Sequence, residues 1–294
     1  MYYIGSVIAG VLISVMILAN GKISEYYGVY SATVIIHAIG LIAVTIVLLI
    51  KKQRIIPVIK LPWIVFTGGF LGYLTVIFNN IAFGKISISA ILALGLFGQI
   101  LTSVIFDEIG VFGMPIKKFN TSKIIGLLIV ILGIVIMIWN EGRASIIPII
   151  LSILTGFTIV FSRTVNAKLA DGTSVITSTW YHYAIGLCAS VIFMFILASR
   201  EPMFNDITIS KNVLIYTGGL IGVICVTILN IAVSKISSFY MTLALFVGQV
   251  FMGIILDISL IGAFSIQILL GGIFVAFGLC FDLWIDRRQD EAKG

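Results

Sequence analysis

A 41-residue segment of this chain occurs twice, and both copies are strongly apolar. The copy from Thr67 to Asp107 returns without a gap from Thr217 to Asp257, 150 positions later. The residues that recur include glycines, amides, a lysine and the last aspartate: Gly68, Gly69, Gly72, Asn80, Lys85, Ser87, Gly98, Gln99 and Asp107 match Gly218, Gly219, Gly222, Asn230, Lys235, Ser237, Gly248, Gln249 and Asp257. An apolar chain with two such halves is typical of a secondary transporter, whose binding site lies between the repeats.

The duplication continues upstream at an offset of 146 residues. The upstream matches between the two halves are two polar residues and one short run: Asn20, Lys22 and the run 38–41 correspond to Asn166, Lys168 and the run 184–187. The difference of four residues between the two offsets falls in the loops. We therefore expect two repeats, residues 1–143 and residues 144–294, the second ending in a short cytoplasmic tail.

The composition places both repeats in a bilayer. Hydrophobic residues make up 60% of the chain and charged residues 10%, which is more apolar surface than one soluble core of this length can bury. A membrane-spanning helix needs about 20 mostly apolar residues. On that criterion we predict an all-α membrane protein with ten transmembrane helices, over residues 2–19, 29–50, 63–84, 86–106, 123–140, 145–165, 174–198, 212–234, 237–256 and 265–285.

The basic residues predict how these helices are oriented. If the N-terminus is cytoplasmic, 13 of the 18 Lys and Arg residues lie in inner loops or in the C-terminal tail, in line with the positive-inside rule. Both termini are then expected to face the cytoplasm from a plasma (inner) membrane. Because each repeat has five spans, an odd number, the second repeat enters the membrane from the opposite side, so the repeats are inverted.

The repeated motifs resemble those of the drug/metabolite transporter (DMT) superfamily, and within it the YdcZ-like proteins. The half-unit of that family carries an Asn near the end of the first span and a Gly-Gln late in the fourth, followed by Asp. Those residues are here Asn20, Gly98-Gln99 and Asp107, and again Asn166, Gly248-Gln249 and Asp257. The resemblance implies a carrier of small organic solutes, with spans one, three, four, six, eight and nine around a central cavity and spans five and ten at the periphery.

One departure from the superfamily concerns the charge of the substrate. Its small multidrug members use a membrane-embedded Glu in the first helix, whereas neither span one nor span six contains a carboxylate here. We therefore expect a neutral, zwitterionic or anionic metabolite rather than a cationic drug.

Polar side chains within the predicted spans are the candidate substrate contacts. Amides offer both donors and an acceptor, and Gln99, Thr102 and Ser103 share one face of a helix. The candidates are Asn80, Gln99, Thr102, Ser103, Tyr181, His182, Asn230 and Gln249. His37 stands in span two one register step out of alignment with His182. The same amides, however, would serve equally well to hold neighbouring helices together.

Charged residues near the ends of spans are candidates for a different role. Asp107 and Asp257 end spans four and nine, where they would act in gating or coupling; the alternative is a carboxylate solvated at the membrane interface. Arg163, near the end of span six, would attract an anionic group or simply extend to the inner surface. The residues do not decide between these uses.

The function expected from these patterns is transport by alternating access. A passive channel would show a continuous polar stripe or a charged ring, and a non-transporting sensor or accessory protein with the same fold stays an alternative. We expect no enzyme activity, no cofactor and no metal, since the sequence shows no catalytic or metal-binding constellation. The expected partners are a small-molecule metabolite and the lipid bilayer, with no nucleic acid; a homodimer stays open.

Overall fold

The structure, a computed structural model, has ten α-helices in the residues that it describes. It describes residues 2–53, 55, 61–111, 116, 124–139, 146–197, 209–236, 238–261 and 266–291, and no strand is present among them. The helices are α1 (Tyr2–Tyr27), α2 (Val29–Ile50), α3 (Thr67–Ala82), α4 (Ile88–Ile109), α5 (Ile124–Ile138), α6 (Ile146–Asp171), α7 (Val175–Leu197), α8 (Thr217–Ala232), α9 (Ser238–Ile261) and α10 (Ile266–Glu291). Each predicted span coincides with one of them. The predicted repeat boundary, between residues 143 and 144, lies outside the described residues.

The helices are long and apolar enough to form a multi-pass membrane protein. Among the described residues, eight helices have the length and hydropathy of a membrane span. For α3 and α8, this span includes the short 3-10 turn before the helix, at Trp63–Phe66 and Val213–Tyr216. The two shorter apolar helices are α5 and the segment Ile266–Gly278 of α10. A helix satisfies its own backbone hydrogen bonds, which is the condition for crossing a bilayer.

Local sequence signals set several of the helix ends. Gly28 forms the one-residue junction between α1 and α2 with a φ of 92°, a conformation that glycine adopts without steric cost. Gly110 ends α4 in the left-handed region, and its N–H donates to the carbonyl of Phe106. At the other end of α4, the side chain of Ser87 accepts from the N–H of Ala90 and caps the helix.

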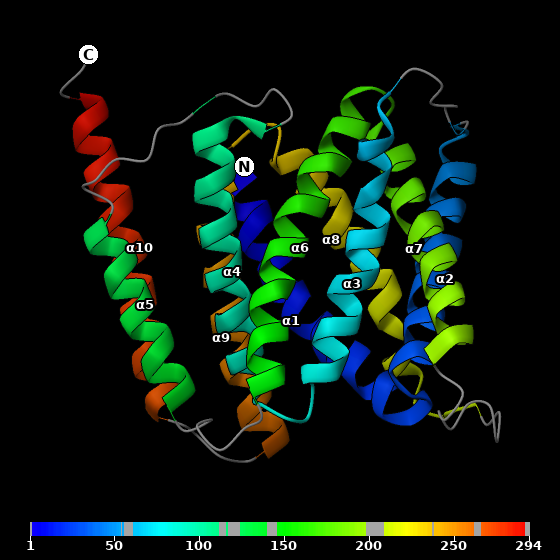
Figure 1. The fold of residues 1–294 in the computed structure, drawn as a ribbon, viewed down its shortest axis with the longest axis horizontal. Coiled ribbons are helices and arrows are strands. Elements are labelled where there is room, and N and C mark those ends of the chain that lie inside the picture. Colours follow the sequence, from blue (N-terminus) through cyan, green and yellow to red (C-terminus); the bar gives the residue numbers. More distant parts are fainter. Residues whose placement is uncertain are drawn as a thin grey trace.

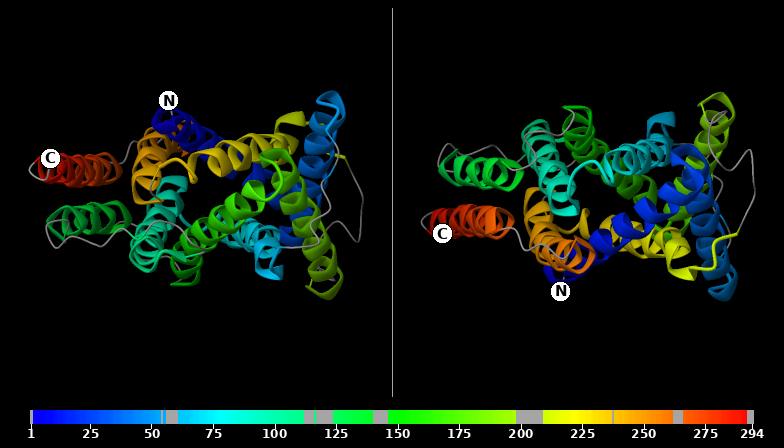
Figure 2. Two further views of the ribbon diagram at one scale, coloured as in Figure 1. Left: turned by 90° about the horizontal axis from the view of Figure 1, so that it is seen from above. Right: turned by 90° about the horizontal axis from the view of Figure 1, so that it is seen from below.

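The two halves pack on each other through equivalent pairs of helices. Helix α1 of the first half lies against α8 and α9 of the second half. Helix α6 of the second half lies in the same way against α3 and α4 of the first half. The pairs α2–α7, α4–α9 and α5–α10 join each helix to its own counterpart. Helices α5 and α10 lie side by side at one edge of the molecule (Figures 1 and 2), as the family resemblance implied.

Glycines bring the backbones of two of these pairs into contact. A Cβ added at Gly156 of α6 would fall on backbone atoms of Gly95, Gly98 and Gln99 in α4. A Cβ added at Gly10 of α1 would fall in the same way on backbone atoms of α9, at Leu245 and Gln249. These positions correspond under the two sequence offsets, so the same contact is built twice. Close approach at small residues is a usual mode of helix association in membranes.

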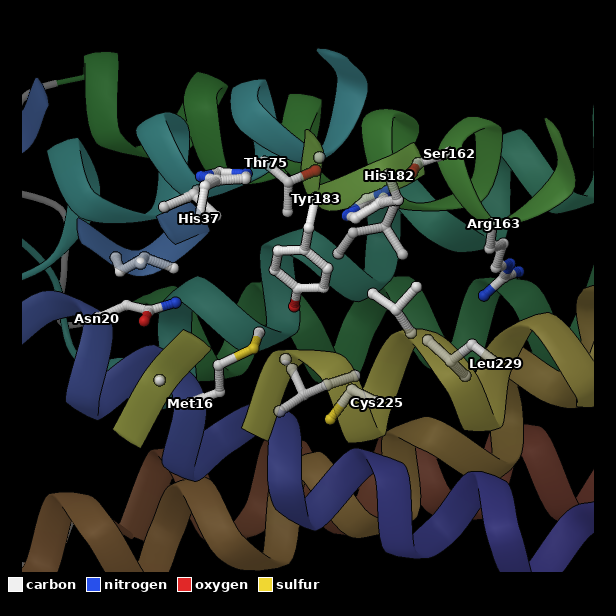
Figure 3. A pocket seen from close by; sticks show the side chains of 18 of the residues that line it. Met16, Asn20, His37, Thr75, Ser162, Arg163, His182, Tyr183, Cys225 and Leu229 are labelled. Atoms are coloured by element: carbon white, nitrogen blue, oxygen red, sulfur yellow. The ribbon is translucent and has the colours of Figure 1, made fainter. Parts of the chain in front are cut away.

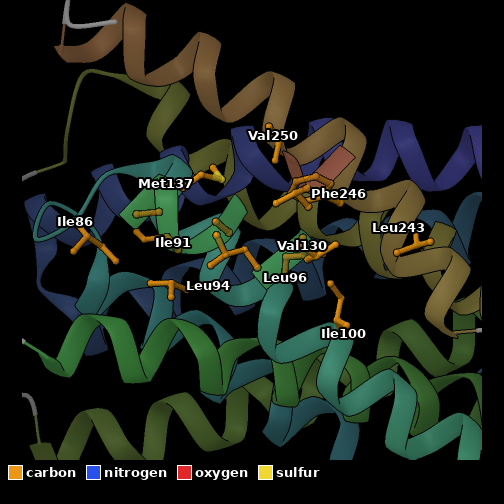
Figure 4. Close-up of a cluster of buried hydrophobic side chains, with 14 of the residues drawn as sticks. Ile86, Ile91, Leu94, Leu96, Ile100, Val130, Met137, Leu243, Phe246 and Val250 are labelled. Carbon is orange, nitrogen blue, oxygen red and sulfur yellow. The ribbon is translucent and has the colours of Figure 1, made fainter. Parts of the chain in front are cut away.

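The largest apolar cluster lies apart from the polar interior. It joins α4, α5, α9 and α10 through fully buried side chains, several of which are seen in Figure 4: Ile91, Leu96, Ile100, Val130, Met137, Phe246 and Val275. The close-up shows side chains of α4, α5 and α9 meeting in one cluster (Figure 4). This packing attaches the α5–α10 pair to the α4–α9 pair, and it leaves the other six helices to enclose a cavity.

Candidate functional site

A cavity of about 110 Å³ lies at the centre of the remaining helices (Figure 3). Since an apolar cavity of about 150 Å³ binds benzene, the space suits a small solute. Its walls come from α1, α2, α3, α6, α7 and α8. The polar lining residues are Asn20, His37, Thr75, Asn79, Ser162, Arg163, Asn166, His182, Tyr183 and Asn230.

The helices around this cavity differ from those implied by the family resemblance. Spans four and nine were expected in its wall, but no residue of α4 or α9 lines it, and α2 and α7 take their place. The reason is the close glycine-mediated packing of α4 on α6 and of α9 on α1. That packing turns Gln99 and Gln249 into the helix interfaces, where both side chains are buried.

Asn166 of α6 organises one side of the cavity. Its Nδ2 donates to the Oγ of Ser162 at 3.2 Å and to the Nδ1 of His182 at 2.9 Å. Because Nδ1 of His182 accepts this bond, the ring proton sits on Nε2 and the imidazole is neutral. Gly68 of α3 has no side chain, so the Oδ1 of Asn166 packs directly on its Cα, and Ser162 donates to the carbonyl of Gly68 at 2.8 Å.

Asn20, the counterpart of Asn166 in the first repeat, occupies the equivalent place on the other side. Its Oδ1 packs on the Cα of Gly218 in α8, as Asn166 packs on Gly68 in α3. Asn20 is buried and lines the cavity (Figure 3). Its Oδ1 has no hydrogen-bond partner among the described residues. The sequence singled out Asn20 and Asn166 as repeated residues but not as site residues.

His37 and Tyr183 form a second equivalent pair where α2 crosses α7. His37 packs on Gly186, and Tyr183 packs on Gly40. The Nδ1–H of His37 donates to the carbonyl of Thr33 at 2.9 Å, which leaves Nε2 as an acceptor. The offset of 146 residues pairs His37 with Tyr183, and this is the signal that would have found Tyr183 as a site residue.

Arg163 of α6 is the one cation in the wall of the cavity. Only 3% of its surface is exposed, so the interpretation of a side chain that extends to the membrane surface is wrong. Its guanidinium donates to Gln99 at 3.4 Å and to Ser103 at 3.0 Å in α4, and to Thr242 at 2.8 Å in α9. These bonds join three helices at one end of the cavity.

The predicted substrate contacts fall into three groups around this geometry. His182 and Asn230 line the cavity, and Gln99 and Ser103 reach it only through Arg163. The remaining four lie outside the lining: Thr102 donates to the carbonyl of Gly98, Tyr181 packs on Phe66 and Trp180, and Asn80 and Gln249 are buried between helices. For these four, substrate contact and the joining of helices both stay predictions.

Asp107 and Asp257 are not solvated at an interface. Each is buried near the end of its own helix, against the start of the other helix of the α4–α9 pair. The carboxylate of Asp257 in α9 accepts from the N–H groups of Ile88 and Ser89, at 3.2 and 3.0 Å, at the start of α4. Reciprocally, Asp107 in α4 accepts from the N–H of Phe239 at 3.3 Å, at the start of α9. Each carboxylate thus satisfies orphan donors of the partner helix and complements its dipole.

This reciprocal capping predicts a loss of stability when the carboxylate is removed. Asp257→Ala is expected to cost about 2 kcal/mol, because two N–H groups would stay buried without an acceptor. Asp171→Ala, at the exposed end of α6, is the matched control and should change stability by less than about 0.5 kcal/mol. Thermal unfolding in detergent measures both; equal melting temperatures for the two variants would contradict the capping role.

A helical membrane protein with a cavity between two similar halves, lined by apolar and polar residues of both, has the architecture of a membrane transporter. A family model described as "Putative inner membrane exporter, YdcZ" matches residues 1–136 and 147–283. The chain belongs to this family, a branch of the DMT superfamily, and the two matched segments correspond to its two halves.

A comparison with solved structures adds the fold alone. A solved structure described as "Crystal structure of protein" is similar with a TM-score of 0.69 and 14% sequence identity, over 97% of both chains. None of the curated proteins compared with the chain matches it.

Proposed function

We propose that this protein is a secondary transporter that moves a small organic metabolite across the inner membrane by alternating access. The observation that carries the proposal is the central cavity, whose polar groups come from six helices of both halves. Intramembrane polar groups are costly, and they are usually found where a substrate or water passes. The membrane-exporter family to which the chain belongs supports the same class of function.

The two halves act, in this proposal, as inverted repeats with both termini in the cytoplasm. In Figure 1, α1 runs downward from the end labelled N, whereas its counterpart α6 runs upward. The reciprocal contacts of Asn20 with Gly218 and of Asn166 with Gly68 fit a two-fold relation between the halves. The excess of Lys and Arg in the loops on one side assigns that side to the cytoplasm.

Alternating access requires that α4 and α9 part at one end of their contact while they stay closed at the other. The reciprocal caps of Asp107 and Asp257 lie at these two ends. We therefore place the gating role of the two carboxylates there: opening one end breaks one cap and keeps the other. Transport then exposes the cavity to one side of the membrane at a time.

The experiment begins with purified protein and a panel of small metabolites. Those that raise its melting temperature are then tested, radiolabelled, for counterflow into proteoliposomes loaded with the same unlabelled solute. A carrier gives transient accumulation of label above equilibrium. A channel gives only equilibration, and a sensor binds the solute without flux, so either of these results would overturn the proposal.

Filling the cavity should stop transport. Val226 lines the cavity, so Val226→Phe places a larger side chain in the space that the solute would occupy, and counterflow is expected to fall at least tenfold. Val247→Phe makes the same change on the exposed surface of α9 and should transport like the unmodified protein. Both variants are checked for an unchanged elution profile in detergent. Full activity of folded Val226→Phe would place the transport route elsewhere.

A further inference from the structure

We propose that Arg163 binds a carboxylate group of the transported solute, so that the substrates are small organic acids or amino acids. This inference rests on the proposed transport function. Arg163 is buried at the edge of the cavity, and its guanidinium presents planar N–H donors whose geometry matches a carboxylate. A charged residue inside a membrane is costly to keep and usually marks a substrate or ion pathway.

Three of the partners of Arg163 are groups that a carboxylate would replace with a gain in interaction strength. The hydrogen bonds to Gln99, Ser103 and Thr242 all end on neutral oxygens. Bonds between a guanidinium and a carboxylate are charge-assisted on both sides and about twice as strong as bonds between neutral groups. The longest of the three bonds, 3.4 Å to Gln99, is the weakest and the first to be exchanged.

The charges around the cavity favour an anion over a cation. Arg163 is accompanied in the lining by neutral amides, hydroxyls and two histidines, and the lining contains neither Asp nor Glu. Asp107 of α4 interacts electrostatically with Arg163, and its carboxylate accepts from the N–H of Phe239 at the start of α9. Asp107 is not part of the cavity wall.

The repeat shows that this cation is an addition to one half. The counterpart of Arg163 in the first repeat is Ile17, and the counterparts of Ser103 and Thr242 are Gly253 and Leu92. Ile17 and Leu92 belong to one buried apolar cluster. The equivalent end keeps a buried amide, Gln249, as the counterpart of Gln99, but none of the counterpart positions carries a charge, so the helix crossing itself does not require an arginine. Arg163 thus gives the cavity one charged end that the other half does not reproduce.

Binding of a carboxylate also has a consequence for the helices. Arg163 now links α6 to both α4 and α9. A guanidinium that turns to the solute gives up some of these links, which loosens this end of the α4–α9 contact. The arrival of the substrate and the opening of that end are thus coupled through one side chain.

The test compares solutes that differ only in charge. The probes are succinate with succinamide, lactate with lactamide, and leucine with leucinamide, each measured by thermal shift and by competition for counterflow of a transported solute. At least one carboxylate should bind, and its amide analogue should bind at least tenfold more weakly. If amides bind as well as carboxylates in every pair that binds, the inference is overturned.

Variants of Arg163 assign that preference to the side chain. Arg163→Gln is expected to lose the preference for the carboxylate, Arg163→Lys to keep part of it, and Lys168→Gln, on the exposed face of the same helix, to keep all of it. A full preference in folded Arg163→Gln would contradict the assignment. If Arg163→Gln does not fold, Arg163→Lys decides, because a point charge without the planar fork should weaken carboxylate binding severalfold.

The same experiment separates this inference from the proposed function. Counterflow that is carried by neutral amides, and is unaffected by carboxylates, would leave a carrier without an anion site. Carboxylate binding that depends on Arg163, without counterflow of any solute that binds, would keep the anion site and remove the carrier.

Discussion

Gly156→Leu is expected to abolish the accumulation of folded protein in the membrane. Gly156 of α6 lies against the backbone of α4, where an added Cβ would overlap backbone atoms of Gly95, Gly98 and Gln99. Backbone atoms cannot rotate aside, so α4 and α6 would have to separate along their shared interface. The same pair of helices carries the bonds of Arg163 to Gln99 and Ser103. Fluorescence-detected size exclusion of a tagged protein measures the loss.

The smaller substitution to alanine gives a graded and controlled version of this experiment. Gly156→Ala should lower stability by about 1–3 kcal/mol, the usual cost of overpacking. Gly95→Ala lies on the same helix contact, but its added Cβ would meet its nearest atom, the carbonyl oxygen of Ser152, at an ordinary 3.5 Å. Gly95→Ala should therefore be close to neutral. Equal effects of the two alanines would mean that the backbones at Gly156 are less close than described.

Much of the fold could be predicted from the sequence, because apolar length and repetition are properties of the chain itself. Ten apolar stretches gave ten helices, and the duplication from Thr67 to Asp107 marked the equivalence of the two halves. The repeated glycines Gly68 and Gly218 each receive an asparagine from the other half. A membrane limits a chain to few arrangements, which makes such predictions more secure than in a soluble protein.

The environment of Arg163 could not be predicted, because it depends on where a helix ends. The expected span stopped at residue 165, which put Arg163 close to the membrane surface. Helix α6 continues to Asp171, so Arg163 lies about two turns before its end, where its side chain is buried against α4 and α9. Polar residues near Asn166 obscured this extension, since a hydropathy criterion ends a span where polar side chains begin.

The place of the amides and carboxylates required knowledge of the neighbouring helix. Asp257 ends an apolar run in the sequence, but nothing in that run indicates that the start of α4 lies beside it. Gln99 and Asn230 are both intramembrane amides, yet only Asn230 lines the cavity. Periodicity shows which residues share a face of one helix. Which face meets a partner and which meets the cavity is decided by glycine contacts between helices.

Cross-links at either end of the α4–α9 pair should each stop transport completely and reversibly. One pair of cysteines, Ser103→Cys with Thr242→Cys, replaces hydroxyls whose oxygens are 3.2 Å apart. The equivalent pair at the other end is Leu92→Cys with Gly253→Cys, where an added Cβ at position 253 would be 2.8 Å from Leu92 Cδ1. Both pairs bring side-chain positions of the two helices into contact, as a disulfide requires, and both are made in a background without the three native cysteines.

The two cross-links discriminate between mechanisms because they hold opposite ends of one helix pair. Positions 92 and 103 are eleven residues apart on α4, about 16 Å along its axis. In alternating access both ends must open in turn, so either disulfide blocks counterflow, and a reductant restores it to the level of the reduced pair. Each single cysteine treated with the same oxidant is the control. Transport that continues through a fully formed disulfide at either end would show that α4 and α9 do not part there, and alternating access at this contact would have to be abandoned.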